Sequence, residues 1–171
     1  SMTVVQRRQA EKLKESLGAD AQSLFNIDPI SIWLANPKTL DPALPPMIKY
    51  IGDEFDKIKP GVAIRSAHVG MAASNTYLFM TKVLPVAIKK YGGVDSDALR
   101  KAALDLDLPE GGTMLGFGVK FEGPESTLAG QNTRAFPVII QYVNDKPVVV
   151  WPKSQQQAEP RLPRPAGLTD S

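Results

Sequence analysis

The chain has 171 residues, with 20 basic and 18 acidic side chains and a formal net charge of +2. This length accommodates one domain, or one domain and a small appendage, and the balanced charge gives no argument for a nucleic-acid or membrane surface as partner. Cysteine is absent and His68 is the single histidine. Disulfides, thiolate chemistry and most zinc or catalytic-triad schemes are therefore excluded. No apolar run is long enough to span a bilayer.

The first predicted element is a helix in the N-terminal segment, residues 1–23. Thr3 and Gln6 have the spacing of a capping box, and Gly18 follows the last apolar position. Basic side chains cover most of this helix, which is typical of a solvated face; a phosphate-binding surface is the less favoured alternative. No signal-peptide pattern is seen and Ser1-Met2 is typical of an expression scar, so we expect a native targeting sequence to lie outside this sequence.

A strand is predicted over residues 30–34, followed by a stiff, proline-rich crossing loop over 36–46. Pro46 suits the first turn of a helix that ends at Ile58, because its missing N–H has no partner to lose there. Apolar residues at helical spacing give this helix one buried stripe. A short apolar run over 62–64 predicts a buried strand.

The longest predicted helix runs over residues 71–91, with an apolar face at helical spacing. Gly92-Gly93 ends it, because glycine accepts the left-handed conformation that closes a helix. Pro85 lies inside it and lacks a main-chain N–H. We therefore expect a kink near Thr81.

A polar cluster lies at and around the N-terminal end of this helix. Its members are Ser66, His68, Ser74, Asn75 and Thr76. The N-terminal end of a helix has free amide donors and partial positive charge, which suits a carboxylate or another anion. The alternative is that the two serines only cap or start the helix.

Asp95 or Ser96 is predicted to cap a shorter helix that buries leucines and alanines. A turn over 109–112 follows, and alternation over 113–121 then predicts a strand whose glycines indicate either close backbone approach or a twist. Beyond a polar loop, β-branched runs predict further strands.

Those last strands cover residues 136–143 and 147–151, and Asn144-Asp145 is a hairpin signal between them. Residues 153–171 are rich in proline and glutamine, and we expect a poorly ordered or extended tail there. The alternation of helices and strands predicts an α/β protein with a mixed sheet, in which the last strands are antiparallel.

The sequence contains no motif that carries catalytic chemistry. The glycine-rich stretch 111–118 leads into a predicted strand rather than a helix, so it lacks the geometry of a phosphate-binding loop. No pair of carboxylates is placed by its spacing for acid–base catalysis. We therefore expect a binding protein without a cofactor rather than an enzyme.

Several blocks of the sequence resemble one family, the type I periplasmic binding proteins that serve ABC importers of branched-chain amino acids, amides and related solutes. The resemblance covers roughly residues 24–152, which we treat as one region between the N-terminal helix and the tail. Its blocks are Trp33–Pro42, Arg65–Tyr77, Val83–Ile88, Asp97–Ala103, Pro109–Phe121 and Gly130–Val138.

The resemblance implies a periplasmic protein of two α/β lobes, each a mixed sheet flanked by helices in three layers. Such a protein traps its solute in the cleft between the lobes and presents it to a membrane permease. The chain matches only a C-terminal portion of the family, so the resemblance implies a fragment of both lobes. A fragment of this kind exposes sheet edges, which self-association or strand exchange would cover.

Two functions remain open. In the first, the chain binds a small amino acid, amide or aromatic acid, and the candidate contacts by their position near the cleft are His68, Ser74, Asn75 and Tyr77. In the second, it is a homo-oligomeric interaction module without a ligand cleft. Core packing is the alternative role for Tyr77.

Overall fold

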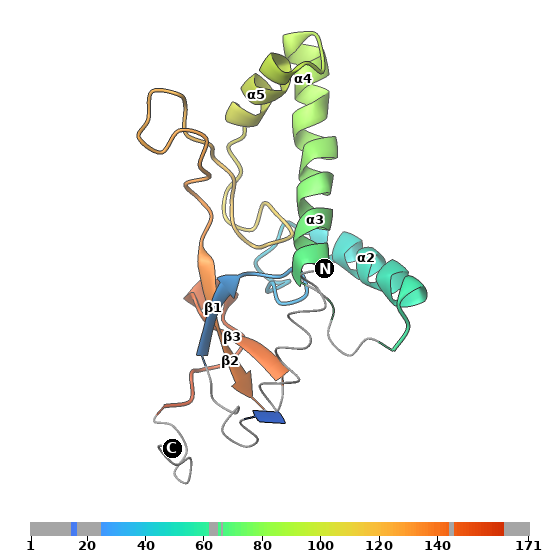
Figure 1. Ribbon diagram of the computed structural model, residues 1–171, viewed down its shortest axis with the longest axis vertical. Helices are drawn as coiled ribbons and strands as arrows, with labels where there is room; N and C mark the ends of the chain where they lie inside the picture. Colours follow the sequence, from blue (N-terminus) through green and yellow to red (C-terminus); the bar gives the residue numbers. More distant parts are fainter. Residues whose placement is uncertain (1–14, 17–24, 62–64, 66, 144–145, 163–171) are drawn as a thin grey trace.

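The computed structural model places a three-stranded sheet at one end of the molecule and an arm of helices at the other (Figure 1). It describes residues 15–16, 25–61, 65, 67–143 and 146–162. Almost all of the predicted N-terminal helix, Ser66 and the predicted strand over 62–64 lie outside the described residues.

The sheet has the order β1-β2-β3, and both pairs of neighbouring strands are antiparallel. The predicted C-terminal hairpin strands are confirmed, with bounds close to those expected, whereas its turn lies outside the described residues. The prediction of a mixed sheet is wrong for the described strands, because the N-terminal strand also runs antiparallel to its neighbour. The strands are β1 (Phe25–Pro29), β2 (Pro137–Val143) and β3 (Lys146–Trp151).

Residues 30–34 do not form the strand that their apolar run predicts. The main-chain N–H of Leu34 donates to the carbonyl of Ser31 at 2.9 Å, so the chain turns here instead of extending. Ile30 and Ile32 are buried nonetheless. A short apolar run indicates contact with the core, but it does not by itself distinguish a strand from another buried segment.

Helix α2 (Leu44–Ile58) begins before the predicted start. Pro45 and Pro46 stand in its first turn, where the missing N–H groups cost no helical hydrogen bond. Part of the predicted stripe packs against the core next to the sheet, namely Met47, Ile48 and Ile51. Ile58, at the end of the stripe, is 74% exposed.

The long helix consists of α3 (Ala67–Leu78), a π-helical turn (Phe79–Val83) and α4 (Leu84–Tyr91). The α-helical hydrogen bonding is therefore interrupted where Pro85 was expected to act. Gly92 ends α4 with a φ of 78°, as predicted for a left-handed cap.

Helix α5 (Ser96–Leu104) packs beside α4 and completes the arm. The Asp95 side chain accepts hydrogen bonds from the N–H groups of Asp97 and Ala98 at 3.0 Å each, which confirms the predicted cap. The buried side chains of the arm form their own cluster: Val83, Ala87, Ala98, Ala102, Leu106 and Val119.

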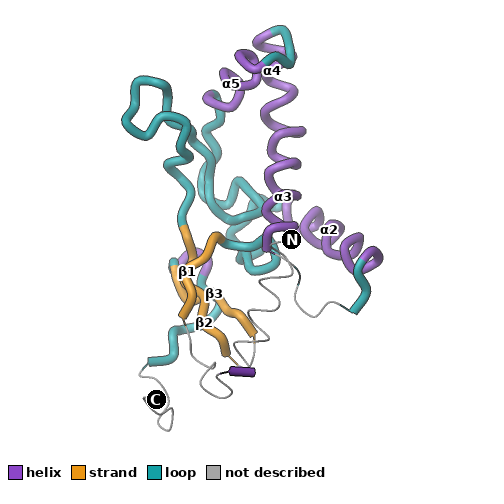
Figure 2. Tube along the Cα trace, in the orientation of Figure 1, coloured by secondary structure: helices purple, strands orange, loops and turns teal. Residues whose placement is uncertain are grey.

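A long connection leads from α5 to β2 (Figure 2). Within it, residues 113–121 form a compact loop rather than the predicted strand. Leu108 and Val119 close this loop by exchanging main-chain hydrogen bonds of 2.9 and 3.0 Å. The predicted close approach at the glycines of this run is confirmed, because a Cβ at Gly118 would lie 2.3 Å from the carbonyl oxygen of Leu108.

Residues 153–162 pack against the sheet, which excludes the poorly ordered alternative for this part of the tail but not the extended one. Lys153–Gln155 is a short 3-10 helix, and Gln155 is fully buried. The N–H of Gln157 donates to the carbonyl of Val149 at 2.8 Å. Residues 163–171 lie outside the described part.

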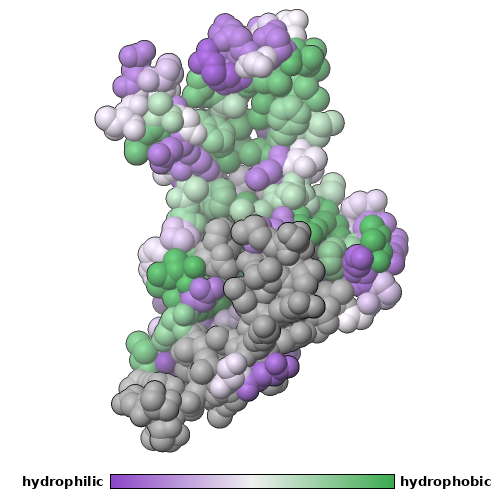
Figure 3. Space-filling model, in the orientation of Figure 1, coloured by the Kyte–Doolittle hydropathy of each residue, from purple (hydrophilic) through white to green (hydrophobic). Residues whose placement is uncertain are grey.

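Hydrophobic surface gathers along the long helix (Figure 3). Its large exposed side chains include Phe79, Met80 and Ile88. Among the described helices, none combines the length and the apolar character that a bilayer span requires.

Candidate functional site

The four residues predicted to contact a ligand all lie on α3. Ser74 is buried, His68 and Tyr77 are half-buried, and Asn75 is exposed. Because α3 begins at Ala67, earlier than predicted, residues 74–77 stand well inside the helix. The argument for an anion at the amide groups of a helix terminus therefore does not apply to them.

Ser74 and Tyr77 line one cavity of about 300 Å³. Three segments enclose it: the loop that leads into α2, one face of the long helix and the loop that follows α5. His68 and Asn75 do not line this cavity. The structure thus brings together two of the four predicted residues.

The helical wall of the cavity consists of Ser74, Tyr77, Leu78, Thr81 and Lys82. Their spacing is that of one helix face. The Thr81 hydroxyl donates to the carbonyl of Tyr77 at 2.7 Å and lies in the π-helical turn, a feature frequently found at functional sites. Sequence analysis missed the last three of these residues, although their helical spacing from Ser74 was a usable signal.

Two loops, residues 41–44 and 108–114, form the rest of the wall. They are joined by the N–H of Asp41, which donates to the carbonyl of Gly111 at 2.9 Å. Gly111 has a φ of 83°, which disfavours any side chain. This contact joins segments far apart in the chain, so no local pattern identified the loops as a wall.

The Ser74 hydroxyl makes no hydrogen bond within the described residues, although Ser74 is only 4% exposed. Ser31 has the same exposure, but its Oγ accepts a hydrogen bond from the N–H of Trp33 at 3.3 Å. Buried polar groups nearly always have partners, and one left without a partner costs about 1–3 kcal/mol. Ser74 therefore contributes a buried hydroxyl without a hydrogen-bond partner among the described residues to the lining of this cavity.

Charged side chains of both signs border the cavity. Lys82 lies on the helical wall, and Asp41 and Glu110 lie on the loops. Asp41 Oδ1 also accepts a hydrogen bond from the N–H of Ala43 at 2.9 Å, which fixes the loop. This lining suits a small polar solute. Across the described part of the chain, no group of three or more carboxylate or imidazole side chains is arranged to hold a metal ion.

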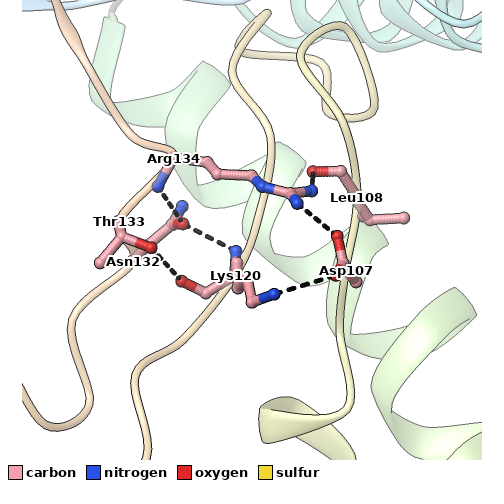
Figure 4. A network of polar contacts seen from close by, with 6 residues as sticks. All are labelled: Asp107, Leu108, Lys120, Asn132, Thr133 and Arg134. Atoms are coloured by element: carbon pink, nitrogen blue, oxygen red, sulfur yellow. Dashed lines mark hydrogen bonds and ion pairs between the residues drawn. The ribbon is translucent and has the colours of Figure 1, made fainter. Parts of the chain in front are cut away.

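A polar network of Asp107, Lys120, Asn132 and Arg134 holds one of the loops in place (Figure 4). Arg134 donates to the carbonyl of Leu108 at 2.6 Å and pairs with Asp107 at 2.5 Å. The hydrogen bond from Lys120, together with the charge of Arg134, holds the pKa of Asp107 below its ordinary value. Because Leu108 lines the cavity, this Asp107 network fixes part of its wall.

No family model matches the chain. Leu/Ile/Val-binding protein homolog 7 of Brucella suis biovar 1 is 33% identical over 111 residues, which make up 65% of this chain and 25% of that relative. The protein of the same name from Brucella melitensis biotype 1 is 32% identical over 111 residues, with the same coverage. The chain therefore spans about a quarter of the length of these curated relatives.

A solved structure, an extracellular ligand-binding receptor from Rhodopseudomonas palustris HaA2, aligns with 81% of this chain and 37% of its own chain. The TM-score is 0.52 and the sequence identity is 18%. The two chains share a fold over this part of the receptor. The predicted fold class is thereby confirmed for a partial molecule, apart from the mixed sheet.

Proposed function

We propose a solute-binding role for this chain, which belongs to the type I periplasmic binding proteins. In this proposal it is part of the solute-binding component of an ABC importer. It holds a small organic molecule by shape and hydrogen bonds and carries out no reaction on it.

The observation that supports this proposal is the buried Ser74 hydroxyl in the wall of the cavity, without a hydrogen-bond partner in the described residues. Tyr77 and Lys82 lie on the same wall and offer a second hydroxyl and a cation. Such donors suit the oxygen atoms of an amino acid, an amide or an aromatic acid. The names of the relatives, Leu/Ile/Val-binding protein homolog, agree with the first of these classes.

His68 and Asn75 lie on α3 but do not line the cavity. We further propose that they contact the solute at a separate part of the binding surface. The expected compartment is the periplasm, and the expected partner is the membrane permease of the importer. Both follow from the family and not from any contact in the structure.

Thermal unfolding with added solutes tests the role. The panel contains L-leucine, L-isoleucine, L-valine, acetamide and benzoate, each at millimolar concentration. A solute that binds only the folded state adds about 2.7 kcal/mol of stability at one hundred times its Kd. We expect at least one solute to raise the Tm, and a panel without any shift would contradict the proposal for this chain.

The variant Ser74→Ala then locates the site. Loss of one hydrogen bond to the solute should cost about 1 kcal/mol, or about fivefold in Kd. Ser31→Ala is the matched control, because Ser31 is equally buried but lies outside the cavity. Equal Kd values for Ser74→Ala and the wild type would place the solute elsewhere.

A further inference from the structure

The C-terminal segment, residues 153–162, is attached to the sheet by glutamine side chains. The N–H of Gln157 donates to the carbonyl of Val149 at 2.8 Å, and the Gln157 side-chain oxygen accepts from the N–H of Val149 at 3.1 Å. The buried amide of Gln141 on β2 donates to the carbonyl of Arg161 at 3.2 Å and accepts from its N–H at 2.9 Å. These bonds fix the segment relative to the sheet.

The side chain of Gln155, in the same segment, is fully buried. Its Oε1 accepts from the main-chain N–H of Asn36 at 3.0 Å, and its Nε2 donates to Thr39 Oγ1 at 3.0 Å. Thr39 Oγ1 in turn donates to the carbonyl of Asn36 at 3.0 Å, so one amide holds both ends of the turn over residues 36–39. This turn leads into residues 41–44, which line the cavity.

The Gln155 side chain also lies against the glycine-rich loop. A Cβ at Gly116 would lie 2.7 Å from Gln155 Oε1, so glycine is needed to make room for the amide. The N–H of Gly111 donates to the carbonyl of Gly116 at 2.8 Å, and the N–H of Asp41 donates to the carbonyl of Gly111 at 2.9 Å. These contacts form a closed circuit from Gln155 through both loops of the cavity wall and back.

Such a circuit sets the distance between the two loops, because each loop contacts both the other loop and the same buried amide. A binding site keeps its geometry where packed and hydrogen-bonded groups behind it hold its lining in place. Gln155 stands behind the lining in this way and is not part of it. Building on the solute-binding role proposed above, we propose that Gln155 is a positioning residue, whose amide holds the loops 41–44 and 108–114 in the arrangement that binds a solute.

Hydrogen exchange of single amides, followed by NMR without solute, tests whether Gln155 holds the loops. Gln155→Met removes both hydrogen bonds of the side chain but keeps an unbranched side chain of the same length, so it leaves little empty space. The N–H groups of Asp41 and Gly111 should exchange about tenfold faster, because the loops separate more often. The N–H of Leu106 in the arm, which donates to the carbonyl of Ala103 at 3.1 Å, should show no comparable change.

Equal acceleration at Asp41, Gly111 and Leu106 would indicate a loss of overall stability alone and would overturn the positioning role, as would unchanged rates at Asp41 and Gly111. Gln156→Met is the matched control, because Gln156 is half-buried and its side chain donates, among the described residues, to the carbonyl of Ala158. It should leave all three rates unchanged.

Thr39→Val is a milder variant that tests the same contact. It keeps the hydrogen bond between Gln155 Oε1 and Asn36 and removes the partner of Nε2. The exchange of Asp41 should accelerate in the same direction as in Gln155→Met, but by less. A wild-type rate at Asp41 in this variant would also count against the positioning role.

Solute affinity tests the consequence for binding. The probe is the solute among L-leucine, L-isoleucine, L-valine, acetamide and benzoate that raises the Tm of the wild type. Calorimetric titration well below the Tm should give a Kd about tenfold weaker for Gln155→Met and an unchanged Kd for Gln156→Met. Gly130→Ala is a second control, since a side chain at its φ of 75° destabilises the fold at a position outside the cavity lining. Its Kd should equal that of the wild type.

The two measurements distinguish the positioning role from the solute-binding role. If no solute raises the Tm, the solute-binding role is contradicted, and the exchange rates alone decide whether Gln155 positions the loops. If a solute binds and Gln155→Met keeps the wild-type Kd, the positioning role is overturned while the solute-binding role stands. Equal losses of affinity in Gln155→Met and Gly130→Ala would assign the effect to lower stability and would also overturn the positioning role.

Discussion

Gln155 Oε1 accepts a hydrogen bond from the main-chain N–H of Asn36 at 3.0 Å, although 119 residues separate the two. The same side chain donates from Nε2 to Thr39 Oγ1 at 3.0 Å. It also packs on Gly116, where a Cβ would lie 2.7 Å from Gln155 Oε1. One buried amide near the C-terminus therefore joins the loop before α2 to the glycine-rich loop, the two segments that form a wall of the cavity.

Replacement of this amide should destabilise the protein. Gln155→Ala removes both hydrogen bonds and leaves the Asn36 N–H without its partner, at a cost of about 2–4 kcal/mol. Gln156→Ala is the control, because Gln156 is only half-buried and, among the described residues, its side chain donates to the carbonyl of Ala158 alone. Urea unfolding followed by circular dichroism measures both. Similar midpoints for the two variants would show that the Gln155 contacts do not stabilise the fold.

Elements with a local signal were predictable from the sequence. Asp95 caps α5 because its own side chain reaches the amides of the next turn, and Gly92 ends α4 because glycine adopts positive φ. Pro85 predicts the interruption of the long helix from a local property as well, because proline has no main-chain N–H to donate. The C-terminal hairpin follows from two β-branched runs around Asn144-Asp145.

Elements set by distant partners were not predictable. The run 113–121 alternates as a strand does, but it folds into a loop because Gly116 lies against Gln155 and Gly118 lies against the main chain of Leu108 and Pro109. The polar residues after 152 gave no apolar pattern, yet Gln155 is buried by its hydrogen bonds. The same holds for the candidate site. Ser74 and Tyr77 were predicted from their place on one helix, whereas the loops on the opposite side of the cavity could be identified only from the structure.

The close approach at Gly111 gives a second prediction. Gly111→Ala and Gly130→Ala both place a side chain at positive φ, 83° and 75°, which costs about 1–2 kcal/mol. At Gly130 nothing lies within 4 Å of the added Cβ, but at Gly111 the Thr39 carbonyl lies 2.1 Å away. Gly111→Ala should therefore cost about 1–3 kcal/mol more than Gly130→Ala. Equal unfolding midpoints in urea would contradict this comparison.

The hydroxyl of Ser74 gives a third prediction, for stability without solute. Ser74→Ala removes a buried polar group that has no partner in the described residues, so it should leave the Tm unchanged or raise it. Ser31→Ala removes an equally buried hydroxyl that accepts from Trp33, and it should cost about 1 kcal/mol. Calorimetry of the two variants distinguishes them. A loss of stability in Ser74→Ala equal to that in Ser31→Ala would mean that the Ser74 hydroxyl is bonded in the solute-free protein.

The Asp107 network gives a fourth prediction, a dependence of stability on pH. Lys120 and Arg134 hold the pKa of Asp107 below its value in the unfolded chain, which is about 3.9. The ionised carboxylate of Asp107 therefore stabilises the folded state fully at pH values above the pKa of Asp107 in the unfolded chain. This contribution is lost as the pH falls through the pKa of the folded state, because Asp107 is then protonated in both states.

Asp107→Asn should therefore lower the Tm at pH 7, and the difference from the wild type should narrow progressively below about pH 5. Glu125→Gln is the control, since Glu125 is exposed and makes no ion pair among the described residues, so its effect should be small throughout this range. Calorimetric scans from pH 7 to pH 3 measure both differences. A difference for Asp107→Asn that stays constant or widens on acidification would show that the carboxylate charge does not act through Lys120 and Arg134. Added salt should also reduce the Tm difference between Asp107→Asn and the wild type at pH 7. The side chains of Asp107, Lys120 and Arg134 are partly exposed, so salt screens their charges.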